Sequence, residues 1–180
     1  MNQMQYTTTY SSPLGEMLLS GDGEHLNGLW FLGQKYFGST LEPGRQEGEI
    51  PVFQQAKRWL DLYFQGLVPD FMPPLAPQGS PFRREVWDVL AQIPRGTVMT
   101  YGEIGALLAK RRGTAAMSAQ AVGGAVGHNP ISILIPCHRV VGSSGSLTGY
   151  AGGLDRKVKL LELEKADTAH LHLPKKGTAL

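Results

Sequence analysis

The sequence predicts an α+β protein, in which a small N-terminal α+β domain is followed by a mainly helical C-terminal domain. Three observations carry this prediction: strand-like patterns in the first 31 residues, a proline-rich stretch at residues 66–79, and helical spacing of apolar residues afterwards. Residues 66–79 hold four of the twelve prolines, so we interpret them as the linker that ends a domain of residues 1–79. Residues 80–167 are predicted to form the second domain. Residues 168–180 lack a clear period and are expected to be a flexible tail.

The N-terminal domain is predicted to hold strands and one helix. Strands are expected over residues 6–10, 17–19 and 26–31. The dipeptide Asp22-Gly23 predicts the hairpin turn between the last two strands. Residues 51–65 carry apolar side chains three and four positions apart and begin with a proline, which predicts an amphipathic helix.

The second domain is predicted to contain four helices, over residues 81–93, 101–113, 118–127 and 154–165. Ser80-Pro81 is a favourable start for the first of them. Thr100 and Glu103 have the spacing of a capping box, which places the start of the second helix. The second and third helices, joined by a basic connection, have the outline of a helix-turn-helix, a weak pattern by itself.

The only cysteine, Cys137, follows the unbroken apolar run Ile131–Ile135, which predicts a buried strand. His138 and Arg139 come directly after it. A lone cysteine is often an inert buried thiol, but neighbouring positive charge lowers the pKa of a thiol and makes it nucleophilic. We therefore interpret Cys137 as the nucleophile and His138 as its candidate base, acting directly or through a water molecule.

Three further side chains are candidates for supporting roles. Glu164 shares the inward face of the last helix with Lys157 and Leu161, which makes it the best carboxylate to orient His138. Asn129 precedes a proline and either forms a plain turn or braces the loop of the cysteine. Tyr150 lies in a glycine-dense segment that matches no phosphate-binding motif, and we interpret it as an aromatic wall.

The distribution of charge points to a phosphate-rich partner, although a solvated basic face remains an alternative. Residues 1–80 carry 4 basic and 8 acidic side chains, whereas residues 81–180 carry 13 and 7, a net charge of +6. One cysteine excludes an intrachain disulfide and a cysteine-based zinc site, and it fits the reducing cytoplasm. No apolar stretch is long enough to span a membrane, and we expect no signal peptide.

The motifs of residues 81–165 resemble one family closely. The run Pro136-Cys137-His138-Arg139-Val140 is similar to the active-site motif of the O6-alkylguanine-DNA alkyltransferases. The flanking segments that agree are residues 93–103, 121–124, 129–130 and 149–164. The N-terminal half matches more loosely, through residues 10–15. The resemblance implies a ribonuclease-H-like N-terminal domain and a winged-helix-like helix-turn-helix in the C-terminal domain.

The resemblance also implies a function and a set of site residues. The protein is expected to act in the cytoplasm as a monomer without cofactor. It would bind double-stranded DNA in the minor groove, flip out O6-alkylguanine or O4-alkylthymine, and move the alkyl group irreversibly to Cys137. His138 would act as base through a water, Glu164 would orient His138, Tyr101 would donate a proton and contact a phosphate, and Asn129 would brace the turn. The expected substrate and DNA contacts are Ala119, Gln120, Gly123, Val140, Tyr150, Ala151, Arg111, Arg112 and Arg139.

The chain departs from the family pattern at two places. Gln120 stands where relatives usually place an arginine finger, and it brings no charge and less stacking area. The connection of residues 109–117 is longer than usual, and we expect its basic residues to contact phosphates. Some relatives hold zinc in the N-terminal domain, but we expect no metal here because His25 is the only histidine before residue 81.

Two other classes of function are compatible with the sequence. One is a cysteine–histidine hydrolase or transferase that acts on a small acyl substrate, for which no oxyanion hole can be identified. The other is a non-catalytic binder of damaged DNA. Relatives of that kind lack the cysteine that this chain keeps.

Overall fold

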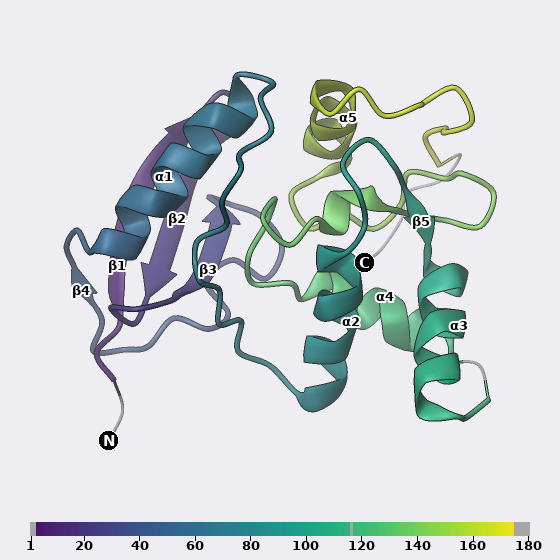
Figure 1. Cartoon of the computed structure of the whole chain (residues 1–180), viewed down its shortest axis with the longest axis horizontal. Coiled ribbons are helices and arrows are strands. Elements are labelled where there is room, and N and C mark those ends of the chain that lie inside the picture. Colours follow the sequence, from purple (N-terminus) through teal and green to yellow (C-terminus); the bar gives the residue numbers. More distant parts are fainter. Residues whose placement is uncertain (1–2, 116, 175–180) are drawn as a thin grey trace. The chain divides into compact units, whose positions relative to one another are not determined.

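Three antiparallel strands open the chain in the computed structural model, which describes residues 3–115 and 117–174. These strands are β1 (Tyr6–Ser12), β2 (Gly15–Gly21) and β3 (Leu26–Phe31), and the short β4 (Gln46–Glu47) pairs in parallel with β1. The order in the sheet is β3-β2-β1-β4 (Figure 1). The predicted hairpin turn is confirmed: Asp22 Oδ1 accepts hydrogen bonds from the amides of Glu24 and His25.

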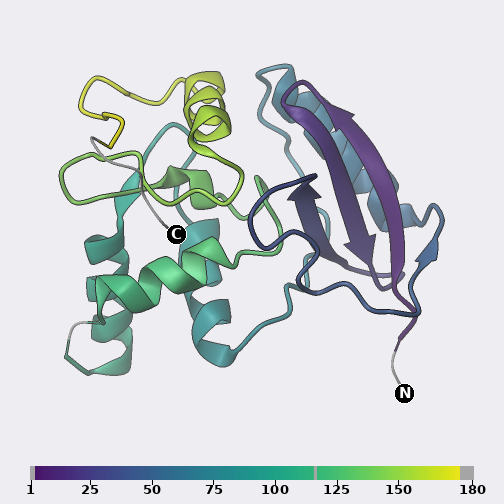
Figure 2. The same ribbon diagram turned by 180° about the vertical axis from the view of Figure 1, so that it is seen from behind.

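One face of this sheet is covered by α1 (Pro51–Phe64), as Figure 1 and the reverse view in Figure 2 show. The helix predicted from residues 51–65 is thus confirmed to within one residue. Its apolar stripe is buried and consists of Val52, Phe53, Ala56, Trp59, Leu60 and Tyr63. The rings of Trp59 and Tyr63 stack with their centroids 5.2 Å apart, which adds an aromatic contact to the burial of apolar area.

The free edge of β3 is covered by two other segments of the chain. Leu26 exchanges backbone hydrogen bonds with Pro74 and Ala76, so part of the proline-rich stretch runs along the strand. Leu29 does the same with Pro130 and Ser132. A covered edge is protected from pairing with other chains. Accordingly, residues 130–132 group with residues 3–78 in one compact unit, and the other described residues form the second unit.

The strand predicted for Ile131–Ile135 is wrong. Only Ile131 makes an isolated bridge, to Leu29, and the following residues form turns. Ile133 has a φ of 71°, in the left-handed region that a β-branched side chain rarely adopts. The run is nevertheless fully buried, as expected. A short apolar run reports burial but cannot distinguish a strand from a buried turn.

The second unit is built from α2 (Pro81–Ala91), α3 (Tyr101–Arg112), α4 (Ala119–Gly127) and α5 (Leu154–Leu163). Local hydrogen bonds fix where these helices begin and end. The capping box is present: Thr100 Oγ1 accepts from the Glu103 amide, and the Glu103 carboxylate accepts from the Thr100 amide. Gly113 ends α3 with a φ of 66°, which suits a glycine. Trp87 Nε1 donates to the carbonyl of Ala125 at 2.8 Å and links α2 to α4.

A two-stranded parallel pair joins distant parts of the second unit. Strand β5 (Met99–Thr100) pairs with β6 (Val140–Val141), with Met99 opposite Val140. The start of α3 is thereby held beside the segment that follows Cys137.

The first part of the predicted flexible tail is held by backbone pairing. The amide of Leu147 donates to the carbonyl of His172 at 2.8 Å, and the amide of His172 donates to the carbonyl of Gly145 at 3.1 Å. Leu171 packs against a cluster of Val141, Leu147 and Leu161. Residues 175–180 lie outside the described residues.

Within residues 3–115 and 117–174, no helix is long and apolar enough to cross a membrane. The same residues contain no group of three or more His, Cys, Asp or Glu side chains placed to hold a metal ion.

Candidate active site

Cys137 lies in a tight turn that begins immediately before it. Pro136 has φ −82° and ψ 66°, and the amide of Cys137 donates to the carbonyl of Ile135 at 2.8 Å, which is the geometry of an inverse γ-turn. Residues Cys137–Arg139 continue as one 3₁₀ turn, η1. Asn129 Nδ2 also donates to the Ile135 carbonyl at 2.8 Å, so the same oxygen is held from two sides. The thiol is buried, with 5% of the residue exposed.

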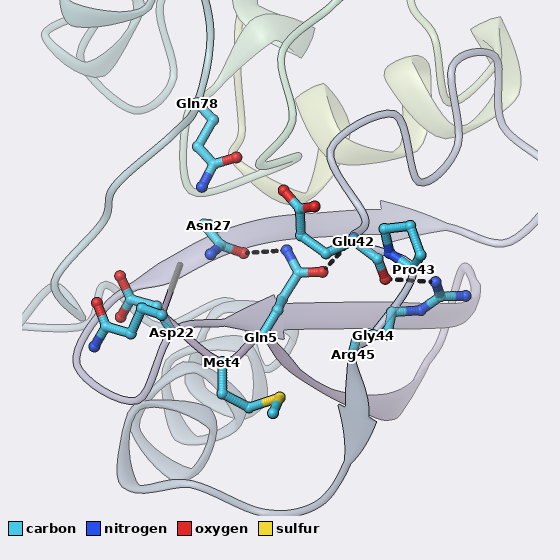
Figure 3. Close-up of a pocket in the computed structure, with 10 residues that line it drawn as sticks. Met4, Gln5, Asp22, Asn27, Glu42, Pro43, Gly44, Arg45 and Gln78 are labelled. Carbon is cyan, nitrogen blue, oxygen red and sulfur yellow. Dashed lines mark hydrogen bonds between the residues drawn. The ribbon is translucent and has the colours of Figure 1, made fainter. Parts of the chain in front are cut away.

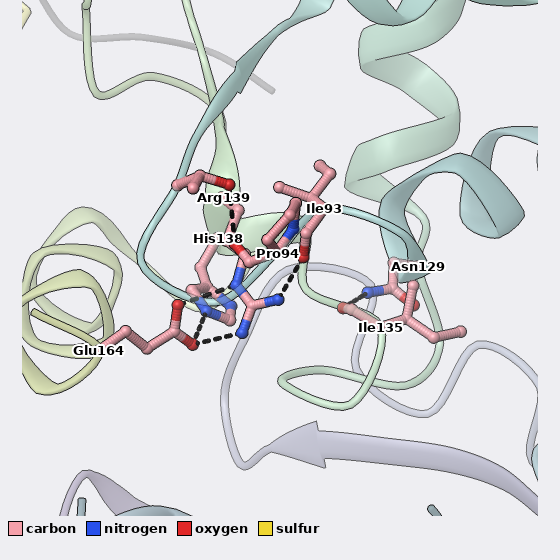
Figure 4. Close-up of polar contacts among 8 residues, drawn as sticks. Ile93, Pro94, Asn129, Ile135, His138, Arg139 and Glu164 are labelled. Carbon is pink, nitrogen blue, oxygen red and sulfur yellow. Dashed lines mark hydrogen bonds and ion pairs between the residues drawn. The ribbon is translucent and has the colours of Figure 1, made fainter. Parts of the chain in front are cut away.

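His138 is paired with Glu164 at the end of α5, as Figure 4 shows. Its Nε2 lies 2.7 Å from Oε2 of Glu164, and both side chains have no exposed surface. Because an ionised carboxylate only accepts hydrogen bonds, Nε2 carries the proton of the neutral ring. The other nitrogen, Nδ1, has no hydrogen-bond partner among the described residues. It is therefore a buried acceptor with its lone pair unused.

Arg139 also binds the carboxylate of Glu164. Its Nε donates to Glu164 Oε1 at 2.8 Å, its Nη2 donates to Oε2 at 2.9 Å, and its Nη1 donates to the Ile93 carbonyl at 2.6 Å (Figure 4). This bidentate pair is the strong geometry for arginine and a carboxylate. The geometry revises the expectation that Arg139 contacts DNA: its guanidinium is engaged inside the protein as a brace of Glu164.

The pKa of Glu164 reflects these contacts. Burial raises it, but hydrogen bonds from His138 and Arg139 outweigh burial and hold the pKa well below its usual value. Glu164 is therefore ionised in the folded protein at neutral pH, and it neutralises the positive charge of Arg139.

The resting states of the thiol and the imidazole are both neutral. Burial raises the pKa of the Cys137 thiol, and a hydrogen bond with Asn129 and the charge of Lys157 only partly oppose it. Burial likewise lowers the pKa of His138, although Glu164 favours the charged ring. The order of residues along the chain favours His138 and Arg139 as the source of the activating positive charge. That assignment is wrong, because the imidazole is neutral and the guanidinium is already paired.

Lys157 on α5 has no exposed surface, and sequence reasoning gave it no role. Its Nζ donates to the carbonyl of Val140 and, at 2.8 Å, to that of Thr148. Burial lowers its pKa to about 8, and the negative charge that Cys137 carries when it is ionised opposes this shift. A signal was present in the sequence: the lysine occupies the inward face of an amphipathic helix, where apolar side chains are expected.

Tyr101 and Tyr150 approach the same site. The Tyr101 hydroxyl donates to the Thr148 carbonyl at 3.1 Å, the oxygen that also accepts from Lys157. Burial, followed by the charge of Cys137, raises the pKa of Tyr101 to about 12. The ring of Tyr150 is buried and meets His138 edge to face, with centroids 6.4 Å apart. Ala151, the next residue, is half-buried.

The expected DNA contacts on α3 and α4 differ in their surroundings. Ala119 and Gln120 are exposed at the start of α4. Gly123 is half-buried, and a Cβ atom at this position would lie 3.9 Å from the ring of Tyr101. Arg111 is exposed. Arg112 instead forms an ion pair with Glu85 and lies over the ring of Phe82 at 5.6 Å.

A cavity of about 450 Å³ lies in the N-terminal unit and is shown in Figure 3. Its lining is mixed polar and apolar and contains no thiol, hydroxyl nucleophile or histidine. The residues are Gln3, Met4, Gln5, Asp22, Asn27, Glu42, Pro43, Gly44, Arg45 and Gln78. None of the predicted site residues is among them.

Comparison with known proteins assigns both halves of the chain to one family. Residues 81–166 match the DNA-binding domain of 6-O-methylguanine DNA methyltransferase, and residues 5–77 match its ribonuclease-like domain. A methylated-DNA–protein-cysteine methyltransferase of Haemophilus influenzae is 40% identical over 161 residues, covering 89% of this chain and 86% of the relative. One from Methanosarcina acetivorans is 42% identical over 167 residues, covering 88% and 97%.

Solved structures agree with this assignment. The crystal structure of the Mycobacterium tuberculosis O6-methylguanine methyltransferase is 42% identical and covers 90% of this chain and 93% of its own, with a TM-score of 0.76. Another structure of the M. tuberculosis protein, in complex with DNA, is 40% identical and has the same TM-score; the match covers 91% and 96% of the two chains. Since matched segments span nearly the whole chain, the protein described here belongs to the 6-O-methylguanine DNA methyltransferase family.

Proposed function

We propose that this protein repairs DNA by transferring the alkyl group of O6-alkylguanine, and of O4-alkylthymine, to the sulfur of Cys137. The observation that carries the proposal is the buried arrangement around the only thiol of the chain. Cys137 follows a braced turn, and His138 next to it has an unused Nδ1 and an Nε2 fixed by Glu164. A base oriented by a carboxylate is the arrangement that activates a nucleophile which is neutral at rest.

The groups of this site can account for every proton and electron pair of the transfer. The Cys137 proton passes to Nδ1 of His138 through a water molecule, and the thiolate sulfur forms a bond to the alkyl carbon. The bond between that carbon and O6 breaks, its electron pair stays on the guanine, and the hydroxyl of Tyr101 protonates the guanine anion. His138 then returns its proton to the Tyr101 oxygen.

Tyr101 becomes a better acid as the reaction proceeds. The negative charge of Cys137 is one of the causes that raise the pKa of Tyr101. This charge disappears when the sulfur becomes a thioether, at the same time as negative charge develops on the guanine. The proton donor is thereby matched to the moment at which a proton is needed.

Each molecule is expected to act once. A thioether is not displaced by the groups of this site, and the chain contains no second thiol that could regenerate the first. The protein is therefore consumed by its reaction, with one alkyl group accepted per chain.

We assign DNA binding to α3 and α4 and propose that they act as a helix-turn-helix, with β5 and β6 as a small winged-helix-like addition. The small exposed residues Ala119 and Gly124 support binding of α4 in the minor groove, because bulky side chains would hold the helix away from a narrow groove. Gln120 is exposed on the same helix and is proposed to fill the gap left by the flipped base. Taking the base out of the stack costs a few kcal/mol, which phosphate contacts offset.

The protein is proposed to work as a monomer and without a cofactor, because the nucleophile, base and acid are all supplied by one chain. A thiol that has to stay reduced fits the cytoplasm. The acyl-hydrolase alternative is not favoured, since the relatives that span the chain carry the methyltransferase name.

The deciding experiment is intact-mass measurement after mixing the protein with a duplex that contains O6-methylguanine. We expect a gain of one methyl group, located on the peptide of Cys137, even when the lesion is in excess. Cys137→Ser, which keeps the size of the side chain, and an undamaged duplex serve as controls and should show no gain. Unchanged protein mass together with intact lesion would rule the proposal out.

A further inference from the structure

A buried positive charge in the second unit lacks an acidic partner. Lys157 has no exposed surface, and its Nζ donates to two backbone carbonyls, those of Val140 and Thr148. Among residues 3–115 and 117–174, no carboxylate lies within ion-pair distance of this nitrogen. The other buried charged cluster differs, because Glu164 neutralises Arg139 and pairs with His138.

Carbonyl oxygens solvate an ammonium group but do not neutralise it. Removing an unpaired charge from water is unfavourable, and the folded protein therefore gives up part of the basicity of Lys157, with a pKa lowered to about 8. The neighbouring positions Leu160 and Leu161 are fully buried and apolar. A methionine or leucine would suit position 157 better if packing were the only requirement.

The anion that this charge can serve is the thiolate of Cys137. Among the described residues, Lys157 is the cation whose charge lowers the pKa of the Cys137 thiol, and a negative charge on Cys137 in turn raises the pKa of Lys157. The other titratable or charged groups around the thiol act differently. Tyr101 remains neutral, His138 is neutral at rest, and the charges of Arg139 and Glu164 offset each other.

We propose that Lys157 is a positioning residue for alkyl transfer, and that its ammonium group, seated on the carbonyls of Val140 and Thr148, is the counter-charge of the Cys137 thiolate. The proposal rests on the proposed function, in which that thiolate is the nucleophile. The positions of the two carbonyls that accept from Lys157 Nζ support this role. Val140 follows η1 directly, and the Thr148 carbonyl also receives the Tyr101 hydroxyl, so one ammonium group ties the nucleophile turn to the proton donor.

Lys157 and His138 have different roles, and these roles follow from their charges. The charge of Lys157 lowers the pKa of His138 as well as that of Cys137. Lys157 therefore stabilises the thiolate and, at the same time, weakens the hold of His138 on the proton it takes up. His138 relays the proton, whereas Lys157 sets the fraction of thiol that is ionised.

The test compares Lys157→Met with Lys159→Met. Lys157→Met removes the charge at similar side-chain length. Lys159→Met makes the same change two positions along α5, where the lysine is 58% exposed and faces Asp155. Because the chain has one cysteine, the ultraviolet absorbance of the thiolate against pH reports Cys137 alone, after subtraction of Cys137→Ser. The second readout is the rate of methyl transfer from an O6-methylguanine duplex across the same pH range.

The thiol of Lys157→Met is expected to titrate about one unit or more above that of the wild type, with methyl transfer roughly tenfold slower at neutral pH. The difference in rate should shrink as the pH rises past the thiol pKa of the variant. Lys157→Arg, which keeps the charge, should recover part of the rate. Lys159→Met should match the wild type in both readouts.

An unchanged thiol titration in Lys157→Met, or a loss of rate that is the same at every pH, would overturn the proposal. If Lys157→Met does not fold, Lys157→Gln replaces it, since the amide still donates to the two carbonyls without a charge. The titration needs no DNA. If the wild type fails to accept a methyl group, the proposed function fails, while the titration still decides whether Lys157 is the counter-charge.

Discussion

His138 and Glu164 form a buried pair, with Nε2 of the histidine 2.7 Å from Oε2 of the glutamate. The pair joins residues 26 positions apart and leaves Nδ1 of the histidine with no hydrogen-bond partner in the described chain. Arg139 holds the same carboxylate through two nitrogens. The orientation of the proposed base therefore depends on a three-residue network whose only anion is Glu164.

Glu164→Gln is expected to reduce both activity and stability. A glutamine can still accept from His138, but it no longer stabilises the charged imidazole, so methyl transfer should slow on the order of 10²-fold. Arg139 is left with a buried charge and no counter-charge, which should lower the free energy of unfolding by roughly 3 kcal/mol. Single-turnover kinetics and urea denaturation measure the two effects. Glu162→Gln, an exposed neighbour, is the control and should change neither.

The stabilisation by Glu164 is expected to depend on pH in a defined direction. The pKa of Glu164 in the folded protein lies below its unfolded value of about 4.3. Its contribution is therefore fully present above the unfolded pKa and is lost as the pH falls through the folded pKa. Urea denaturation should show a constant difference between the wild type and Glu164→Gln near neutral pH, and a smaller one below about pH 4. A difference that grows on acidification would contradict this account.

Arg139→Met is expected to lower the free energy of unfolding without changing the electrostatic part of DNA binding. The substitution leaves Glu164 as a buried anion with one partner fewer, which should cost about 3 kcal/mol of unfolding free energy. Because the guanidinium is bound to Glu164 and Ile93, the salt dependence of DNA affinity should not change. Binding titrations at several salt concentrations provide the measurement. A shallower salt slope in Arg139→Met would show that this arginine does contact phosphates.

Arg111 and Arg112 are expected to behave differently although they are neighbours. Arg111 is exposed, and Arg111→Ala should reduce the salt slope of DNA binding by about 0.9, the effect of one phosphate contact. Arg112 already pairs with Glu85 and lies over Phe82, so Arg112→Ala should change the slope less. The same binding titrations measure both variants. If the double variant keeps the affinity and slope of the wild type, the connection of residues 109–117 makes no phosphate contact.

The sequence by itself determined the features that depend on nearby residues. The capping box of Thr100 and Glu103, the start of α2 at Pro81 and the end of α3 at Gly113 all involve hydrogen bonds or torsions within four residues. The inward position of Glu164 could also be predicted, because helical periodicity fixes which residues share a face. The location of the lone thiol beside a histidine is a property of the chain itself.

Only the tertiary structure decided how distant groups share charge and hydrogen bonds. Ile131–Ile135 was predicted as a strand, but burial without a neighbouring strand along its length left it as a turn. Arg139 was expected at the DNA, yet its partners Ile93 and Glu164 lie 46 and 25 positions away. Lys157 can donate to the carbonyls of Val140 and Thr148 only when β6 and the loop of Thr148 lie next to α5. Charge pairing in a buried site acts through space, so the order of residues along the chain does not reveal which charge remains for the thiol.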